Sequence, residues 1–273
     1  MHGLLSSPPF SKDSGLLISQ TKRELRRLNL RARKGLGQHF LVDDRVLKRL
    51  ISAVSLTPGD TVIEVGPGMG ILTRELAKGA DRVITMNLHS PQIQGFFRVP
   101  VDHLLAGRIL CDYFQRCSLK DCVVVAPDAG SAKRAGHYAI KLGLPLAILD
   151  KRRSDDTESP VIHNVIGDIK GKKALIFDDE IASGGSILEV VKALENLGVE
   201  EIEACCVHAV LSGSAVEKLA KSSIKKLVTT DTVFIPEYKK FPQLVVLSVA
   251  ELFAKAIMST NRGESISVLY DKF

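Results

Sequence analysis

Two adjacent aspartates, Asp178 and Asp179, follow the apolar run "ALIF" and precede a loop of small residues. Such a run predicts a buried parallel strand, and the carboxyl ends of parallel strands are where α/β proteins bind ligands. Two carboxylates at that position can hold ribose hydroxyl groups directly or through Mg²⁺. A capped helix after a strand would account for only one acid and one serine, so the pair indicates a binding site.

The loop of small residues spans positions 182–186 and runs into an apolar pattern with helical spacing. Backbone N–H groups at a helix N-terminus favour a bound phosphate dianion. Ser183, Gly184, Gly185 and Ser186 supply such groups together with two hydroxyls. Aspartates and loop together therefore predict a site for ribose phosphate and Mg²⁺.

A second glycine loop lies nearer the N-terminus, in "TVIEVGPGMGILTREL". "TVIEV" predicts a buried parallel strand, and the helix after the loop is expected to end with Gly79 as its C-cap. Gly66, Gly68 and Gly70 lack Cβ atoms, so the backbone can approach a ligand and direct N–H groups toward it. A glycine loop alone is weak evidence, because many α/β folds use one only for packing.

Positive charge is concentrated in one segment of the chain. The net charge is +6, and residues 21–34 ("TKRELRRLNLRARK") hold seven Lys or Arg and one Glu, so the remainder is neutral overall. We expect this basic N-terminal arm, residues 1–34, to be either a solvated helix or a weak contact to RNA through charge. Beyond it, apolar residues between positions 46 and 54 predict a helix that Asp43 or Asp44 can cap.

The composition is that of an ordinary globular protein, with 45% hydrophobic and 25% charged residues over 273 positions. No apolar run approaches the ~20 residues of a membrane span, and no secretory leader is recognisable. Five scattered cysteines without a C-x-x-C pair predict reduced thiols in the core. We therefore expect a cytoplasmic protein without membrane contact.

The stretch "GLGQHFLVDDRVLKRL", followed by "VIEVGPGMGILTREL", resembles the start of the rRNA adenine dimethyltransferases, which use S-adenosylmethionine. This resemblance covers about residues 20–83 and implies that His39, Leu41 and Gly66 line a cofactor pocket. The family needs an acid after its second strand and an Asn-(Leu/Ile)-Pro-Tyr segment, whereas this chain has Asn87 and no such tetrapeptide. The loop is therefore interpreted as vestigial, and we expect neither methyl transfer nor appreciable binding of S-adenosylmethionine.

Segments between residues 80 and 273 resemble, in family order, phosphoribosyl pyrophosphate synthetase (ribose-phosphate diphosphokinase). They include "TMNLHSPQIQGFFRVPVDHL", "VVVAPDAGSAKRA", "LDKRR", "GDIKGKKALIFDDEIASGGS" and "GESISVLY". The resemblance implies a Mg²⁺-dependent enzyme of nucleotide biosynthesis, active as a homo-oligomer. Such an enzyme transfers the β,γ-pyrophosphoryl group of ATP to the 1-hydroxyl of ribose 5-phosphate.

The resemblance also implies roles for individual residues. His89 and Asp128 would be the Mg²⁺ positions, and Lys151 and Arg153 would lie on a mobile arm that closes over the triphosphate. The ribose 5-phosphate site would consist of Asp178, Asp179, Ala182, Ser183, Gly184, Gly185 and Ser186.

The chain departs from that family in three respects. Asn87 stands where the family usually has Asp, and Ala182 stands where many members have Asp. Most of the first of two similar α/β halves is missing, including a segment that grips adenine, and the methyltransferase-like start stands in its place. Three hypotheses follow: an impaired diphosphokinase, a non-catalytic ribose-phosphate-binding or regulatory subunit, or an accidental chimera carrying a methyltransferase remnant.

The predicted fold is α/β. A phosphoribosyltransferase-like parallel-sheet domain is expected at residues 105–273, ending in a C-terminal helix and tail. Before it, residues 35–104 are expected to form a composite region that joins a truncated Rossmann-like methyltransferase fragment to the end of the synthetase's first domain. The junction lies near Gly79, where both families have a helix leading into a strand.

Overall fold

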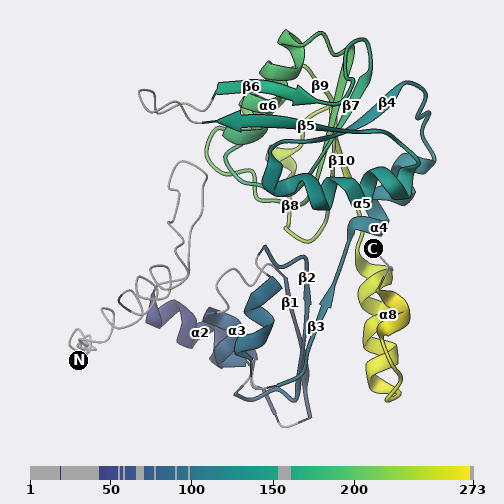
Figure 1. Ribbon diagram of the computed structural model, residues 1–273. Coiled ribbons are helices and arrows are strands. Elements are labelled where there is room, and N and C mark those ends of the chain that lie inside the picture. The colour runs from purple at the N-terminus through teal and green to yellow at the C-terminus, as the bar shows by residue number, and fades with distance from the viewer. Residues whose placement is uncertain are drawn as a thin grey trace, which may run out of the picture.

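The computed structural model describes residues 43–54, 56–57, 59–65, 71–76, 78–89, 91–97, 99–152 and 161–270, together with Ser19. Two β-sheets with flanking helices make up this part of the chain (Figure 1). Several predicted features lie outside it: the basic arm at residues 21–34, His39, Leu41, Gly66, Gly68, Gly70 and Arg153.

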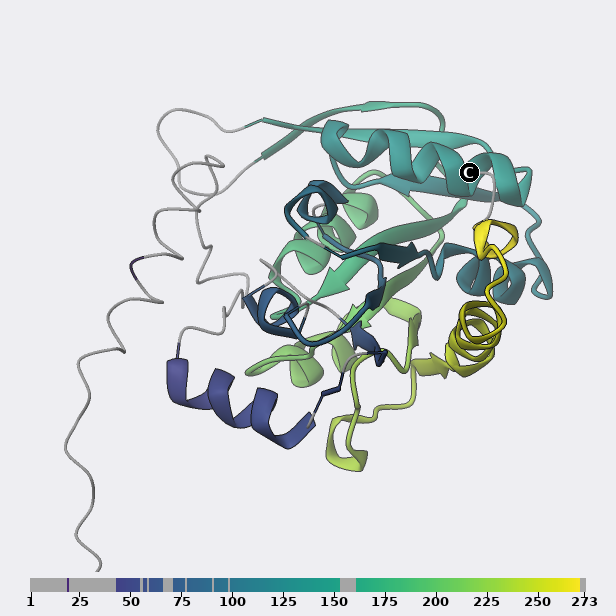
Figure 2. The same ribbon diagram turned by 90° about the horizontal axis from the view of Figure 1, so that it is seen from below.

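The first sheet contains three parallel strands in the order β1-β2-β3, with β1 at Thr61–Val65, β2 at Arg82–Met86 and β3 at Val101–Leu104. Helix α2 (Asp44–Val54) precedes β1, α3 (Ile71–Leu76) connects β1 to β2, and the 3-10 helix η2 (Pro91–Phe96) connects β2 to β3. Figures 1 and 2 place α2 and the C-terminal helix α8 (Ala250–Asn261) on opposite sides of this sheet.

The predicted cap of α2 is confirmed, because Asp43 Oδ1 accepts a hydrogen bond of 2.8 Å from the backbone N–H of Arg45. The predicted C-cap of α3 is wrong. Helix α3 ends at Leu76, and Gly79 lies in the following turn without the left-handed φ of a glycine cap. A Cβ at Gly79 would come 3.2 Å from Cβ of Leu56, so close approach is what the turn requires there.

The second sheet contains seven strands in the order β10-β9-β8-β7-β4-β5-β6. All neighbours are parallel except β5 and β6, which are antiparallel. This arrangement confirms the predicted α/β class with a largely parallel sheet in the C-terminal part of the chain. The strands are β4 (Cys122–Ala126), β5 (Leu146–Arg152), β6 (Val161–Ile166), β7 (Lys173–Ile181), β8 (Glu201–Ala209), β9 (Ile224–Thr230) and β10 (Leu244–Leu247).

Helices connect these strands, as parallel pairing requires. They are α4 (Gly107–Gln115), α5 (Ala132–Leu142), α6 (Gly185–Asn196) and α7 (Ala215–Ala220), with short 3-10 turns η3 (Ala129–Ser131), η4 (Glu237–Lys239) and η5 (Ser267–Leu269). In the described part of the chain, no helix has the length and apolar character to cross a membrane.

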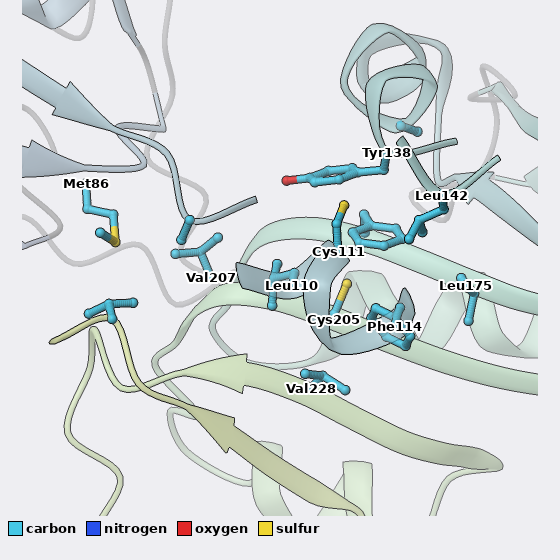
Figure 3. Close-up of a cluster of buried hydrophobic side chains, with 14 of the residues drawn as sticks. Met86, Leu110, Cys111, Phe114, Tyr138, Leu142, Leu175, Cys205, Val207 and Val228 are labelled. Carbon is cyan, nitrogen blue, oxygen red and sulfur yellow. The ribbon is translucent and has the colours of Figure 1, made fainter. Parts of the chain in front are cut away.

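Strand β7 is the centre of the core because its side chains alternate between two apolar layers. Phe177 stacks on Tyr138 of α5, with ring centroids 4.1 Å apart, and packs with Phe114 of α4. Figure 3 shows Tyr138 and Phe114 in this layer. Ile176 faces the other layer, where it clusters with Val190 of α6. All five cysteines are free and four are buried, which confirms their prediction as core thiols.

One apolar cluster joins the two sheets. Ile84, Met86 and Leu104 from the first sheet share this cluster with Phe253 and Ala256 of α8 and with the α4–α5 layer of the second sheet. Figure 3 shows Met86 next to Val207 of β8. The end of β2 is therefore held against the second sheet, which matters for the site below.

Among the glycines in the described part of the chain, Gly167 is expected to tolerate substitution least. Its φ is +108°, and an added Cβ would lie 2.9 Å from the carbonyl oxygen of Leu146. Gly171 also has a left-handed φ, +68°, but nothing lies within 4 Å of an added Cβ. We expect Gly171→Ala to lower the free energy of unfolding by about 1 kcal/mol, and Gly167→Ala by about 3 kcal/mol or more because strain and overlap add.

Urea denaturation of the two variants provides the measurement. Equal losses of stability would contradict the close approach of Gly167 to Leu146.

Candidate functional site

A cavity of about 860 Å³ lies where β4 and β7 end. Its walls come from the segment after β2, from η3 and α5, from the end of β7 and from the start of α6. The structure thus brings together residues that lie far apart in the sequence. Predicted site residues among its lining are His89, Asp128, Asp178, Asp179, Ala182, Ser183, Gly184, Gly185 and Ser186.

Of the two predicted catalytic residues, Lys151 and Arg153, the structure describes only the backbone of Lys151. Lys151 belongs to β5 near its carboxyl end, next to the antiparallel strand β6, but its side chain is outside the described part of the structure. Arg153 lies wholly outside it. Their roles therefore stay predictions.

The loop of small residues has a backbone that requires glycine. Gly184 is the N-cap of α6 and has a left-handed φ of +76°, and an added Cβ would meet the side chain of Leu219 at 3.5 Å. Gly185 then begins the helix. The first-turn N–H groups of α6 have no acceptor within the helix, and Ser183, Gly185 and Ser186 line the cavity. An anion in the cavity would meet these donors.

The two aspartates are tied to their surroundings by Arg134. The Nη1 atom of Arg134 lies 3.2 Å from Asp179 Oδ2, and its Nη2 atom lies 3.5 Å from Asp178 Oδ1. Asp178 Oδ1 also accepts a hydrogen bond of 2.8 Å from the backbone N–H of Asp179. One guanidinium group therefore compensates two neighbouring carboxylates.

His89 reaches this pair from the first sheet. Its Nδ1 lies 2.5 Å from Asp179 Oδ2. The hydrogen bond with Asp179 raises the pKa of His89 above its ordinary value, although burial opposes the shift. A carboxylate that holds one imidazole nitrogen fixes the direction of the ring and directs the other nitrogen, Nε2, elsewhere.

The environments of the two aspartates push their pKa values apart. Burial raises the pKa of Asp178, and its hydrogen bond with Asp179 adds to the increase. Burial also raises the pKa of Asp179, but hydrogen bonds from His89 and Asp178 and the charge of Arg134 outweigh it and hold the pKa below its ordinary value. The negative charge of the pair is therefore concentrated on Asp179.

The residues present fit a Mg²⁺ ion that is held mainly by substrate oxygens. Asp128 caps η3, with its Oδ1 accepting a bond of 2.8 Å from Ser131 N–H, and its exposed carboxylate borders the cavity. His89 can hold a metal-bound water. The described residues contain no group of three or more His, Cys, Asp or Glu that could hold a metal alone. Mg²⁺ commonly uses one or two carboxylates together with phosphate oxygens and water.

Asn87 has a structural role at the end of β2. Its φ is +46°, a conformation that asparagine tolerates better than most residues, and its Oδ1 accepts a bond of 2.7 Å from Ala106 N–H. The chain turns there toward His89.

Arg134 was not among the predicted site residues. The sequence places it on the helix after Asp128, but its partners are 44 and 45 positions away along the chain. Only the fold brings α5 beside the end of β7, so no local pattern could have identified these contacts.

Two protein families match different parts of the chain. The phosphoribosyl transferase domain family matches residues 102–240. The ribosomal RNA adenine dimethylase family matches residues 29–90, of which residues 29–42 and several later positions lie outside the described part of the chain.

Curated relatives match the C-terminal part. A ribose-phosphate pyrophosphokinase from Caldanaerobacter subterraneus subsp. tengcongensis is 52% identical over 195 residues, which is 71% of this chain and 61% of the relative. The Corynebacterium ammoniagenes protein of the same name is 49% identical over 193 residues, with the same shares covered. The chain thus spans about three-fifths of the length of these relatives.

A solved structure matches over more of the chain. The crystal structure of phosphoribosylpyrophosphate synthetase from Mycobacterium smegmatis superposes with a TM-score of 0.64 and 27% identity. The superposition covers 90% of this chain and 96% of that one.

Proposed function

Because the chain belongs to the phosphoribosyl transferase domain family and its C-terminal part is homologous to ribose-phosphate pyrophosphokinase, we propose that it binds ribose 5-phosphate with Mg²⁺–ATP. In the proposed reaction, the 1-hydroxyl oxygen of ribose 5-phosphate attacks the β-phosphorus of ATP. The bond from that phosphorus to the oxygen of the α-phosphate breaks, AMP leaves, and the hydroxyl proton is released. The products are phosphoribosyl pyrophosphate and AMP.

Ribose 5-phosphate would occupy the cavity with its phosphate on the loop at residues 182–186. The first-turn N–H groups of α6, which have no acceptor within the helix, and the hydroxyls of Ser183 and Ser186 support this placement. Asp178 would accept hydrogen bonds from the ribose hydroxyls. Oδ2 of Asp179 is already in contact with His89 and Arg134. Asp179 would therefore mainly orient His89 and would contact the sugar less than Asp178 does.

The remaining groups would act on the transferring phosphates. When bound, Mg²⁺ would supply positive charge that neutralises the transferring phosphates. Asp128 and His89 would hold its coordination sphere from two sides of the cavity, and Lys151 and Arg153 would place cations on the developing charge. The observation that carries the proposal is that His89 and Asp128 share one cavity with the ribose-phosphate loop.

A second candidate is a non-catalytic ribose-phosphate-binding or regulatory subunit in a homo-oligomer of the cytoplasm. The observation that favours it is the length of the match, 61% of the relatives, together with the dimethylase-like segment in front of it. Both candidates require the same ribose 5-phosphate site and differ in whether ATP is used.

Ribose 5-phosphate with Mg²⁺ is expected to protect the protein against thermal unfolding, and the double variant Ser186→Ala/Asp179→Ala should lose that protection. The two substitutions remove a donor to the phosphate and the carboxylate that orients His89. The measurement is the shift in melting temperature over a titration of ligand.

A matched control makes the same two chemical changes far from the cavity. Ser265 and Asp168 are exposed and do not line it, so Ser265→Ala/Asp168→Ala should keep full protection. Unchanged protection in the Ser186/Asp179 double variant would place the ligand elsewhere and overturn the proposed site.

A further inference from the structure

The ends of β2 and β8 meet beside the candidate site. Met86, the last residue of β2, and Val207 of β8 are fully buried in one apolar cluster and lie next to each other in Figure 3. The residues that follow them in the chain, Asn87 and His208, make a polar contact across the same junction. Nε2 of His208 lies 3.1 Å from the backbone oxygen of Asn87. The first sheet is thus attached to the second two residues before His89.

The chemistry of this contact assigns its direction. A carbonyl oxygen can only accept, so Nε2 of His208 carries the proton and donates it to Asn87. The other nitrogen, Nδ1, lies 2.9 Å from the hydroxyl of Thr232, whose single proton has two acceptors at that distance, Nδ1 and the backbone oxygen of Val207. Burial lowers the pKa of His208, which favours the neutral ring that this pattern requires. Both ring nitrogens are therefore engaged, and the ring is fixed in place.

Asn87 itself is held from several directions. Its N–H donates to Leu104 O at 3.0 Å, its Oδ1 accepts from Ala106 N–H at 2.7 Å, and its carbonyl accepts from His208. Leu104 is the last residue of the neighbouring strand β3, and Ala106 is the N-cap of α4. His208 ties Asn87 directly to a strand of the second sheet.

The segment from Asn87 to His89 contacts the second sheet near the carboxyl ends of its inner strands β7 and β8. His208 on β8 is the register partner of Glu180 on β7, and Glu180 directly follows Asp179. The segment from Asn87 to His89 is consequently attached at two points to neighbouring strands, at His208 through its backbone and at Asp179 through the His89 ring. The backbone attachment at Asn87 sets the position of the main chain from which the His89 side chain extends. A shift of about 1 Å at a reacting group can lower a rate 10²-fold.

We propose that His208 is a positioning residue: by holding the carbonyl of Asn87, it fixes His89 against Asp179 and thereby places His89 at the metal and phosphate end of the cavity. The consequence for Mg²⁺ rests on the proposed function, whereas the placement of His89 does not. His208 acts through Asn87 and does not line the cavity.

Amide hydrogen exchange in the metal-free protein tests the placement. The N–H of Leu88, between Asn87 and His89, donates to His103 Nε2 at 2.7 Å and reports local opening of this segment. The N–H of Val83, at the start of the same strand, donates to Pro100 O and serves as the reference. In His208→Leu we expect Leu88 to exchange about tenfold faster relative to Val83, the effect of losing one buried hydrogen bond. His208→Gln, which keeps an N–H donor, should restore slow exchange.

The Nδ1 proton of His89 gives a second readout without metal, because its bond to Asp179 slows its exchange with water. We expect that proton to be observable by NMR in the wild type and in His208→Gln, and lost in His208→Leu. Unchanged exchange of Leu88 in His208→Leu would overturn the proposal. So would equal acceleration of Leu88 and Val83, which would mean that His208 serves only global stability.

The Mg²⁺ requirement connects the placement to the site. The Mg²⁺ concentration at half-maximal protection by ribose 5-phosphate should rise about tenfold in His208→Leu. In a His89→Ala background the same substitution should add nothing, since coupled residues are not additive. Additive effects would overturn the role of His208 through His89. Absence of any ligand protection in the wild type would instead count against the proposed function, while the two metal-free readouts still decide the placement of His89.

Discussion

Replacing Gly184 with alanine is expected to weaken binding of ribose 5-phosphate by about ten- to hundredfold. Gly184 holds a left-handed φ of +76° at the N-cap of α6, and an alanine there relieves its strain by rotating the adjoining peptide groups. Rotation turns a backbone N–H away from the cavity. A hydrogen bond to a charged group contributes about 1.5–3 kcal/mol, and each 1.4 kcal/mol is about tenfold in affinity. Calorimetric titration with ribose 5-phosphate and Mg²⁺ measures the loss.

Gly198 provides a matched control beyond the other end of the same helix. Its φ is +77°, and its nearest neighbour to an added Cβ, Lys170, lies at 3.6 Å, so the local strain is nearly the same. Both substitutions should lower the free energy of unfolding by about 1–2 kcal/mol, but Gly198→Ala should leave ligand affinity unchanged. If both variants bound ribose 5-phosphate as the wild type does, the loop at residues 182–186 would not be the phosphate site.

The sequence is informative wherever the structure depends on neighbours along the chain. Strand β7, the glycine at the N-cap of α6 and the cap at Asp43 follow from apolar runs and from small or polar residues within a few positions. The resemblance to a known family added Asp128 and His89, which carry no local signal of their own. In the structure these distant residues line one cavity, while their membership of a functional site and their chemical roles stay proposals.

Contacts between elements could not be predicted in this way. Arg134 and His208 owe their positions to the packing of α5 and of the first sheet against the ends of β7 and β8. The C-cap assigned to Gly79 failed for the same reason, because the contact with Leu56 across the turn decided the need for glycine. Helix α2 has the predicted apolar stripe, yet Val46 and Val54 remain 44% and 48% exposed, and among its residues only Leu47 is buried.

The junction between the two resemblances is a continuous sheet in the structure. Strand β1, from the dimethylase-like segment, pairs in parallel with β2, and Thr61 lies opposite Arg82. No residue from 78 to 86 has a left-handed φ. The pairing of β1, before Gly79, with β2, after it, is regular. The dimethylase-like segment therefore extends the sheet of the synthetase-like part without local backbone strain. Support of the fold does not by itself supply a site for ATP.

Formation of phosphoribosyl pyrophosphate by this chain is therefore expected to be at least ~10²-fold slower than by a full-length relative. The match covers 61% of the relatives' length, and the resemblance implies that the segment that grips adenine is missing. His89 and Asp128 can place charge and metal beside the phosphates, but a nucleoside held about 1 Å out of line can forfeit 10² in rate. The measurement is Mg²⁺- and ribose 5-phosphate-dependent release of AMP from ATP, at protein concentrations where binding of ribose 5-phosphate has been verified.

An ordinary kinase rate of ~1–100 s⁻¹ would contradict this expectation. The front segment would then have to hold the adenosine. Its glycine loop would be the first candidate for that contact, since backbone N–H groups after a strand suit a nucleotide. Gly68→Val tests whether the loop binds adenosine: a fall in rate with unchanged binding of ribose 5-phosphate would assign adenosine to the loop. An unchanged rate would exclude the loop as the adenosine site. Slow turnover together with intact ribose 5-phosphate binding would mean that the two α/β segments share a sheet while only the second retains its substrate site.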